Sequence, residues 1–330
     1  MTPGCGLTVI LPAYNEAESL TELVPELVAV LRRLSLGGQA YEILVIDDGS
    51  TDDTVARVTA LCAIYPDLKL LSLRRNFGKS AALATGFTAS RGRSVITMDA
   101  DLQDDPAEIP QLLAELEHGL DLVSGWKRTR HDPITKTLPS LLFNRVTSHL
   151  TGIRLHDFNC GLKAYRREVV ESISLYGEMH RYIPVLAHAE GFRVGEREVR
   201  HRARRFGRSK FGSARFVNGF LDLFEVMFLA GGRRTPLHVF GRLGAWLLAL
   251  GGGINVYMLF VWIAEGRLRV RPLLLFGVIL VILGIQFISM GLLAELIHAP
   301  QMRRRSYPLR LQVPAGPTTE APVEGGEGRV

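Results

Sequence analysis

The first 125 or so residues alternate between short apolar runs and longer segments whose apolar residues recur at helical spacing. The apolar runs predict buried strands at residues 7–11, 42–46, 68–73 and 94–98. The segments between them predict helices at residues 18–34, 51–64 and 80–89. Continuous Val, Ile and Leu strands separated by helices are typical of a sheet covered on both faces, so we expect a mainly parallel α/β sheet.

The C-terminal half has a different pattern. Residues 243–263 and 273–296 are long and nearly free of charge, and about 20 apolar residues suffice to span a bilayer. The connector, residues 264–271, is too short for a domain, so the two segments predict a transmembrane hairpin. Arginines flank the hairpin at positions 233, 234, 242 and 303–305, which favours cytoplasmic termini, although three arginines in the connector weaken this asymmetry.

Two further segments adjoin the hairpin. Residues 216–228 carry phenylalanines and other apolar residues at helical spacing, which predicts an amphipathic helix in the membrane interface or an ordinary core-facing helix. The tail after Pro308 is rich in Pro, Gly and Glu, and we expect it to be disordered. The expected organisation is therefore an α/β domain (1–200), a basic and amphipathic juxtamembrane segment (201–235), two transmembrane helices (236–298) and a disordered cytoplasmic tail (299–330).

Composition supports a membrane protein. The mean hydropathy of +0.15 is high for a typical soluble enzyme, although 22% of residues are charged. The net charge of +6 could indicate nucleic acid, but the basic residues concentrate around the apolar segments, which favours a membrane surface and anionic phosphates and argues against nucleic acid. The three cysteines have no paired spacing, and the N-terminus shows no secretory signal pattern, so we expect a cytoplasmic α/β domain.

An acidic cluster follows the fourth predicted strand. Asp99 and Asp101 are two residues apart, and in an extended chain both side chains point the same way. Two aligned carboxylates suit a divalent cation that also holds a diphosphate. A calcium loop is excluded because its sixth and twelfth positions would be Asp104 and Pro110 instead of Gly and Glu, whereas a solvated acidic turn remains the alternative.

The loops after three strands should share one edge of the sheet. Residues 12–16, 47–50 and 99–103 each follow a predicted strand, and ligands of parallel sheets bind beyond the carboxyl ends of the strands. No glycine-rich dinucleotide loop or P-loop follows an early strand. The polar side chains that can instead accept hydrogen bonds from a nucleobase or ribose are Tyr14, Glu16, Asp47 and Asp48.

Three motifs, in this order, resemble family 2 glycosyltransferases with a GT-A fold. They are Pro12-Ala-Tyr-Asn-Glu16, Val45-Ile-Asp-Asp-Gly-Ser-Thr-Asp52 and Asp99-Ala-Asp-Leu-Gln-Asp-Asp-Pro106. The later segments Asp157-Phe-Asn-Cys-Gly-Leu-Lys-Ala-Tyr-Arg166 and Arg204-Arg-Phe-Gly-Arg-Ser-Lys-Phe-Gly212 are similar to the polyprenyl-phosphate glycosyltransferases, which include dolichol-phosphate mannose synthases and bacterial bactoprenol glucosyltransferases. The match runs from about Thr8 through the hairpin.

The resemblance implies the residues of the donor site. The side chains expected at the nucleoside are Pro12, Tyr14, Glu16 and Asp48. Those expected to hold Mg²⁺ or Mn²⁺, and through it the donor diphosphate, are Asp99, Asp101 and Gln103, with Asp101 in a catalytic role. Lys79 occupies the glycine-rich turn of the family, where it either lies beside the donor or is an ordinary surface lysine.

The resemblance also implies an acceptor site. The side chains expected to clamp the lipid phosphate are Arg204, Arg205, Ser209 and Lys210, with a second group at Lys127, Arg128 and Arg130. The alternative for the basic run is a solvated or lipid-facing surface. Asp157 is the family's candidate base, but a phosphate monoester with a second pKa of about 6 needs none, so Asp157 could instead orient the acceptor or cap a turn.

The resulting functional prediction is inverting transfer of one sugar from a nucleotide sugar to polyprenyl (undecaprenyl) phosphate at the cytoplasmic membrane face. UDP-glucose is the first expectation, with GDP-mannose or another UDP-sugar as alternatives. The Gln-x-x-Arg-Trp run of processive synthases is missing from the sequence, which favours single-sugar transfer. The alternatives are a membrane-anchored protein that binds a nucleotide sugar without turnover, or a glycosyltransferase with a non-lipid acceptor. A homo-oligomer is compatible with the family resemblance.

Overall fold

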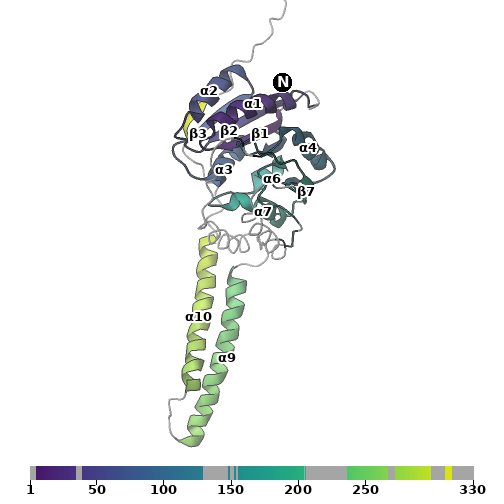
Figure 1. Cartoon of the computed structure of the whole chain (residues 1–330). Helices are drawn as coiled ribbons and strands as arrows, with labels where there is room; N and C mark the ends of the chain where they lie inside the picture. The colour runs from purple at the N-terminus through teal and green to yellow at the C-terminus, as the bar shows by residue number, and fades with distance from the viewer. Residues whose placement is uncertain are drawn as a thin grey trace, which may run out of the picture. The chain divides into compact units, whose positions relative to one another are not determined.

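The computed structural model describes residues 5–34, 39–128, 148, 152–153, 155–203, 205, 236–266, 272–298 and 309–313. The chain divides into two compact units, each described by itself. The α/β unit comprises Met1–Leu223 and Ser306–Val330, and the helical unit comprises Phe224–Arg305. Figure 1 shows the layered α/β unit and the two long helices of the helical unit.

The α/β unit is built on one mixed sheet. Its strand order is β7-β5-β6-β4-β1-β2-β3-β8. The centre consists of four parallel strands, β1 (Cys5–Ala13), β2 (Ala40–Asp47), β3 (Leu68–Leu73) and β4 (Ser94–Thr97). The other strands are β5 (Leu122–Trp126), β6 (Lys163–Arg166), β7 (Val194–Glu198) and β8 (Leu309–Val313), of which β6 and β8 run antiparallel to their neighbours. The four central strands confirm the four strands that the sequence predicts, and the other strands extend the sheet on both sides.

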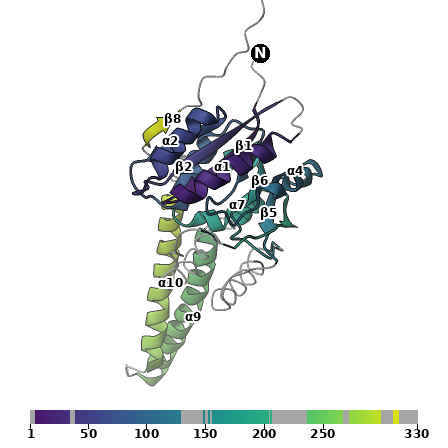
Figure 2. The ribbon, with the colours of Figure 1, turned by 45° about the horizontal axis from the view of Figure 1, so that its top comes forward.

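Helices cover both faces of the sheet. They are α1 (Ala17–Leu31), α2 (Thr54–Ile64), α3 (Lys79–Ala89), α4 (Ile109–Glu117), α6 (Arg167–Ser172) and α7 (Ile183–Ala189), with short 3₁₀ helices η1 (Pro106–Glu108) and η2 (Met179–Arg181). In Figure 2, α1 and α2 lie side by side across the strands. α3 packs on the opposite face, where a Cβ atom at Gly86 would meet Ile10. The alternation of strands with helices therefore gives three layers, as the pattern predicts.

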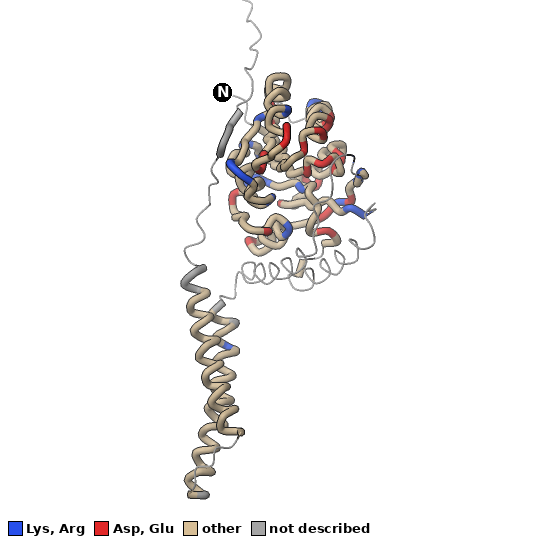
Figure 3. The backbone as a smooth tube through the Cα atoms, turned by 60° about the vertical axis from the view of Figure 1, so that its left-hand side comes forward, with Lys and Arg blue, Asp and Glu red and all other residues tan. Residues whose placement is uncertain are grey.

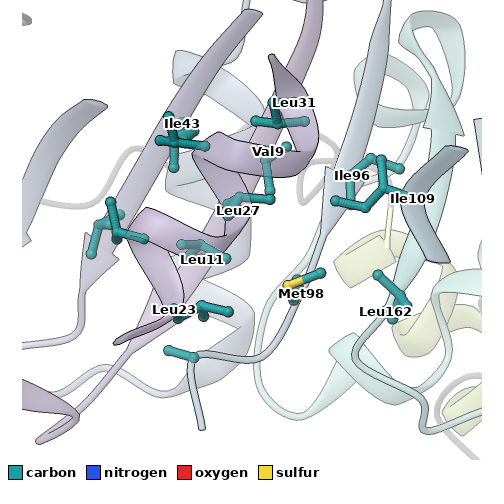
Figure 4. Close-up of a cluster of buried hydrophobic side chains, with 14 of the residues drawn as sticks. Val9, Leu11, Leu23, Leu27, Leu31, Ile43, Ile96, Met98, Ile109 and Leu162 are labelled. Carbon is teal, nitrogen blue, oxygen red and sulfur yellow. The ribbon is translucent and has the colours of Figure 1, made fainter. Parts of the chain in front are cut away.

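The main hydrophobic core lies between the sheet and the face covered by α1, α2 and α4. Leu20, Leu23, Leu27 and Leu31 recur at the i, i+3, i+7 spacing of one helix face, and none is more than 1% exposed. In Figure 4, the α1 residues Leu23, Leu27 and Leu31 lie in one apolar cluster with the strand residues Val9, Leu11, Ile43 and Ile96. This packing fixes the ends of the central strands, and with them the loops that follow.

The helical unit is a pair of antiparallel helices, α9 (Pro236–Glu265) and α10 (Pro272–His298). Glycines line their contact: a Cβ atom at Gly244 would lie 2.6 Å from the carbonyl oxygen of Gly284, and one at Gly251 would lie 2.7 Å from that of Gly277. Small residues at such contacts let two helix backbones approach closely. Figure 3 shows these helices almost entirely without charged residues, which confirms the two long apolar segments.

Part of the predicted disordered tail is ordered, so that prediction is wrong for Leu309–Val313. These residues form β8 and pair antiparallel with β3, with Ser72 opposite Leu311. The physical reason is that Leu309-Arg-Leu-Gln-Val313 alternates with a period of two, and the outer edge of β3 offers unpaired backbone groups. The predicted amphipathic helix at residues 216–228 lies outside the described residues.

Candidate active site

Three loops meet at the carboxyl edge of the parallel strands. β1 pairs with β2 so that Ala13 is opposite Asp47, and with β4 so that Ile10 is opposite Thr97. The loops that leave these strands, residues 14–16, 48–53 and 98–105, are therefore neighbours. This confirms the expectation that the polar motifs share one edge of the sheet.

The first two loops are joined by hydrogen bonds. Asn15 adopts the left-handed conformation, with φ of 56°, which asparagine tolerates better than most residues. Its backbone N–H donates to Ser50 Oγ over 2.9 Å, and its side-chain Oδ1 accepts from the N–H of Thr51 over 2.8 Å. The N–H of Glu16 donates to Thr54 Oγ1 over 3.0 Å. The segment that contains Pro12, Tyr14 and Glu16 is thus fixed against the loop after β2.

The two aspartates after β2 have structural partners. The carboxylate of Asp47 accepts from Ser72 Oγ over 2.6 Å and from the N–H of Ser50 over 3.0 Å. The carboxylate of Asp48 accepts from the backbone N–H groups of Phe77 and Gly78, over 2.8 and 2.9 Å. Burial raises the pKa of Asp48, which these two bonds partly offset. Asp48 therefore holds the turn that leads to Lys79, and its contact with a nucleoside stays a prediction.

Asp99 lies in a strongly cationic environment. The ammonium group of Lys79, the first residue of α3, forms an ion pair with its carboxylate. Burial alone would raise the pKa of Asp99, but the positive charges of Lys79, Lys127 and Lys163 outweigh it and lower the pKa to about 2. Gly161 packs directly on the same carboxylate, since a Cβ atom there would come closer than 3.0 Å to it.

The acidic loop is not extended. The prediction that Asp99 and Asp101 point the same way because they lie two apart in an extended chain is therefore wrong in its reason. β4 ends at Thr97, and Leu102 adopts a left-handed φ of 63°. This bend lets Asp101 Oδ1 accept from the N–H of Gln103 over 3.2 Å. The alternation of side chains holds only within a strand, and here the strand ends at Thr97, before either carboxylate.

The predicted metal ligands are two carboxylates and one amide from a single loop. Among the described residues, no three His, Cys, Asp or Glu side chains are arranged to hold a metal ion. Carboxylate and amide oxygens are nevertheless the ligands that Mg²⁺ accepts, often with only one or two carboxylates and with substrate phosphates completing the shell. Asp99, Asp101 and Gln103 fit a divalent cation in chemical type, and their role as its ligands stays a prediction.

Two further lysines lie near this loop. Lys127 forms an ion pair with the buried carboxylate of Asp104 over 2.7 Å, and although burial opposes its charge, Asp104 raises the pKa of Lys127. Lys163, which sequence reasoning missed, is 3% exposed and donates to the carbonyl oxygen of Cys160. Burial lowers the pKa of Lys163. Its signal in the sequence is a charged residue within the short run Leu162-Lys-Ala-Tyr165, whose other residues are hydrophobic.

Asp157 precedes the turn that carries Gly161. It is 2% exposed, and its Oδ1 accepts from the N–H of Asn159 over 3.1 Å. Its backbone carbonyl accepts from Ser124 Oγ over 3.3 Å. The carboxylate thus stabilises the turn, as one alternative reading of the sequence expects, and its catalytic or orienting role stays a prediction.

The residues just before the basic run, which begins at Arg204, lie along the acidic loop. The N–H of Arg202 donates to the carbonyl oxygen of Gln103 over 2.9 Å, and His201 forms a β-bridge with Asp104. The guanidinium group of Arg202 contacts Asp105 over 2.8 Å and binds both carboxylate oxygens of Glu26, over 2.7 and 2.9 Å. Arg205 pairs with Glu22 of α1 over 3.2 Å. The other predicted acceptor residues, Arg130, Arg204, Ser209 and Lys210, lie outside the described residues.

Comparison with known families identifies the chain. Residues 8–174 match the family model of "Glycosyl transferase family 2". The protein belongs to glycosyl transferase family 2. The matched residues include the loops after β1, β2 and β4, and the segment from Asp157 to β6. The resemblance inferred from the motifs is confirmed.

Two relatives extend the similarity over most of this glycosyltransferase. Dodecaprenyl-phosphate galacturonate synthase from Rhizobium johnstonii is 38% identical over 308 residues, which cover 92% of this chain and 90% of the relative. Undecaprenyl-phosphate 4-deoxy-4-formamido-L-arabinose transferase from Salmonella paratyphi A is 36% identical over 301 residues, which cover 88% of each chain. Both names describe transfer of a sugar to a polyprenyl phosphate, in agreement with the narrower resemblance.

A solved structure supports the fold of the glycosyltransferase. Glucosyl-3-phosphoglycerate synthase from Mycobacterium tuberculosis, in complex with Mn²⁺, UDP and phosphoglyceric acid, superposes with a TM-score of 0.55. The alignment covers 68% of this chain and 79% of that protein, at 20% sequence identity. The prediction of a GT-A fold is confirmed.

Proposed function

We propose that this family 2 glycosyltransferase transfers a single sugar from a nucleotide sugar to a polyprenyl phosphate at a membrane surface. The observation that carries the proposal is the hydrogen bond between Arg202 and Gln103, with the bridge between His201 and Asp104. These contacts hold two residues that lie just before the predicted acceptor residues Arg204 and Arg205 in the sequence beside the loop that carries the predicted ligands of the donor diphosphate. The names of the two relatives support the same pair of substrates.

The helical unit supports a membrane location. Phe240–Ala264 and Pro272–Ala294 are long and apolar enough to cross a membrane, and only 11% and 17% of their most apolar windows are buried within the protein. Core helices of a soluble protein would be mostly buried. The chain leaves the α/β unit before α9 and returns to it at β8. If α9 and α10 each cross the membrane once, both ends of the hairpin lie on the same side of the membrane. We propose that this side is cytoplasmic, where nucleotide sugars are made.

The reaction is an in-line displacement at the anomeric carbon. An oxygen of the acceptor phosphate forms the new C–O bond, and the bond to the donor diphosphate breaks with its electron pair on the departing nucleoside diphosphate, which inverts the anomeric configuration. A phosphate monoester is mostly dianionic at neutral pH because its second pKa is about 6, so the nucleophile needs no proton removed. A divalent cation held by Asp99, Asp101 and Gln103 would, when bound, stabilise the charge that develops on the leaving group.

The chain's own cations assist both phosphates. The pKa of Asp99 is lowered by the positive charges of Lys79, Lys127 and Lys163. The same charges therefore act on the position expected for the donor diphosphate. Lys127 also belongs to the second predicted acceptor clamp, and its pairing with Asp104 holds it beside the acidic loop. Asp157 orients the acceptor through the turn that it stabilises.

We propose a UDP-sugar as the donor, with galacturonate or a 4-formamido-arabinose as the transferred group, because these sugars occur in the names of the two relatives. The expected UDP-glucose has no such support and becomes one member of the test panel. The names of these relatives also favour a lipid acceptor over a soluble one.

The test is transfer by the full-length protein in detergent micelles. Purified protein is incubated with undecaprenyl phosphate and each of four labelled donors: UDP-galacturonate, UDP-4-formamido-arabinose, UDP-glucose and GDP-mannose. Lipid product is separated by thin-layer chromatography, with Mg²⁺ and Mn²⁺ in parallel. A labelled lipid from one UDP-sugar supports the proposal. Binding of donors without any labelled lipid would instead support the alternative of a binding protein without turnover.

A further inference from the structure

We propose that Lys79 is an exchangeable counter-ion of Asp99. In the absence of a divalent cation, its ammonium group pairs with the carboxylate, and when Asp99 coordinates the cation, Lys79 turns to the donor diphosphate. The proposal rests on the proposed function, because it assumes that Asp99 is a cation ligand and that the donor carries a diphosphate. It adds that one lysine couples the binding of these two ligands.

The first supporting observation is the exposure of the ion pair. The side chains of Lys79 and Asp99 are 31% and 29% exposed, so solvent and ligands can reach both. An ion pair in contact with water contributes little to stability, and a better partner for either group can replace it. The lysine side chain is flexible and its ammonium group acts as a point charge, so it can follow an anion without a fixed geometry.

The second observation is that Asp99 itself cannot move away easily. Gly161 packs on one side of its carboxylate, at a distance that would not admit even a Cβ atom. The backbone N–H of Asp99 donates to Asp104 Oδ2 over 3.2 Å, which ties the residue to the acidic loop. An exchange of partners at Asp99 therefore moves Lys79, while the carboxylate stays in place.

The third observation is that the other two lysines are held more firmly. The side chain of Lys127 is 13% exposed, and it pairs with an Asp104 carboxylate that is 0% exposed. Lys163 is 3% exposed and bonds to the carbonyl oxygen of Cys160. Of the three lysines that act on Asp99, only Lys79 both contacts the carboxylate directly and has a side chain that is almost one-third exposed.

The proposed exchange predicts that one substitution, Lys79→Met, strengthens the binding of Mn²⁺ and weakens the binding of UDP. In Lys79→Met, the ion pair with Asp99 is gone, so Mn²⁺ alone should bind more tightly, roughly threefold to tenfold, as expected for removal of a partly exposed ion pair and a nearby positive charge. With Mn²⁺ saturating, UDP should bind at least roughly tenfold more weakly, because a charge-assisted hydrogen bond to the diphosphate is lost. A residue that only supports the fold would weaken both.

The experiment uses the full-length protein in detergent. Binding of Mn²⁺ without nucleotide is followed by electron paramagnetic resonance of the free ion, and binding of UDP at saturating Mn²⁺ by calorimetry. Lys69→Met is the matched control: Lys69 pairs with Glu42 over 2.6 Å, and its side chain is 27% exposed, so the same charge is removed from a lysine of similar exposure elsewhere. Lys79→Arg keeps the charge and should retain wild-type coupling between Mn²⁺ and UDP.

The outcomes separate this inference from the proposed function. Tighter Mn²⁺ binding with weaker UDP binding in Lys79→Met, and neither change in Lys69→Met, supports the exchange. Unchanged or weaker Mn²⁺ binding in Lys79→Met overturns it, even if the wild-type protein makes the lipid product. Failure of the wild-type protein to transfer any sugar, with the opposite effects still observed, would overturn the proposed function alone.

Discussion

The contact between Gly161 and Asp99 gives the sharpest prediction, because one added methyl group should disturb the acidic loop directly. Gly161 lies outside the left-handed region, so its backbone accepts alanine without strain. The new Cβ atom would instead lie closer than 3.0 Å to the carboxylate of Asp99, a separation that packed atoms do not adopt. Either the turn at Gly161 or the Asp99 side chain must therefore move in Gly161→Ala.

Overpacking of this kind costs about 1–3 kcal/mol. For a domain of roughly 200 residues, each kcal/mol lowers Tm by about 2–4 °C, so Gly161→Ala should unfold about 2–12 °C below the wild-type protein. Tm is measured by intrinsic fluorescence, which Trp126 in β5 reports for the α/β unit. Transfer activity should fall as well, because Asp99 is displaced from Lys79 and from the position expected for the cation.

A double-mutant cycle tests the stated cause. In Asp99→Ala the carboxylate is gone, so adding Gly161→Ala should lower Tm by much less than it does in the wild-type background. An equal loss of Tm in both backgrounds would refute the reasoning, since the clash would then involve another neighbour. Gly252→Ala is a control for the substitution itself, because nothing lies within 4 Å of a Cβ atom at Gly252.

Three other predictions follow from the structure. In Leu311→Pro, β8 loses a backbone donor opposite Ser72, so hydrogen exchange of the β3 amides should accelerate relative to Leu311→Val; unchanged exchange would contradict the β8 pairing. In Asp157→Asn, the cap on Asn159 persists and no base is needed, so kcat should fall less than the roughly hundredfold typical of a lost base; a larger fall at unchanged Tm would indicate a base. The pKa of Asp99 is lowered to about 2, so its contribution to stability is fully present above its unfolded pKa and is lost only as pH falls towards about 2; Mn²⁺ affinity of the wild-type protein that drops tenfold between pH 7 and pH 5 would contradict this.

The sequence by itself determined the parts of the protein that depend on local pattern. Apolar runs of strand length gave the four parallel strands, and apolar periodicity gave α1, because burial of one helix face requires that spacing. The long charge-free segments gave α9 and α10. The motifs at the strand ends predicted the position of the candidate site, since the carboxyl ends of parallel strands meet at one edge of the sheet.

Only the tertiary structure decided which charges meet. Lys79 and Asp99 are 20 residues apart, Lys127 and Asp104 come from different loops, and Arg202 reaches Glu26 across 176 residues. No local pattern encodes such pairs, because they follow from how helices and strands pack. The same holds for β8, whose alternation is too short to stand out in the sequence until the edge of β3 offers it a partner. Local periodicity specifies elements, whereas long-range packing specifies the electrostatics of the site.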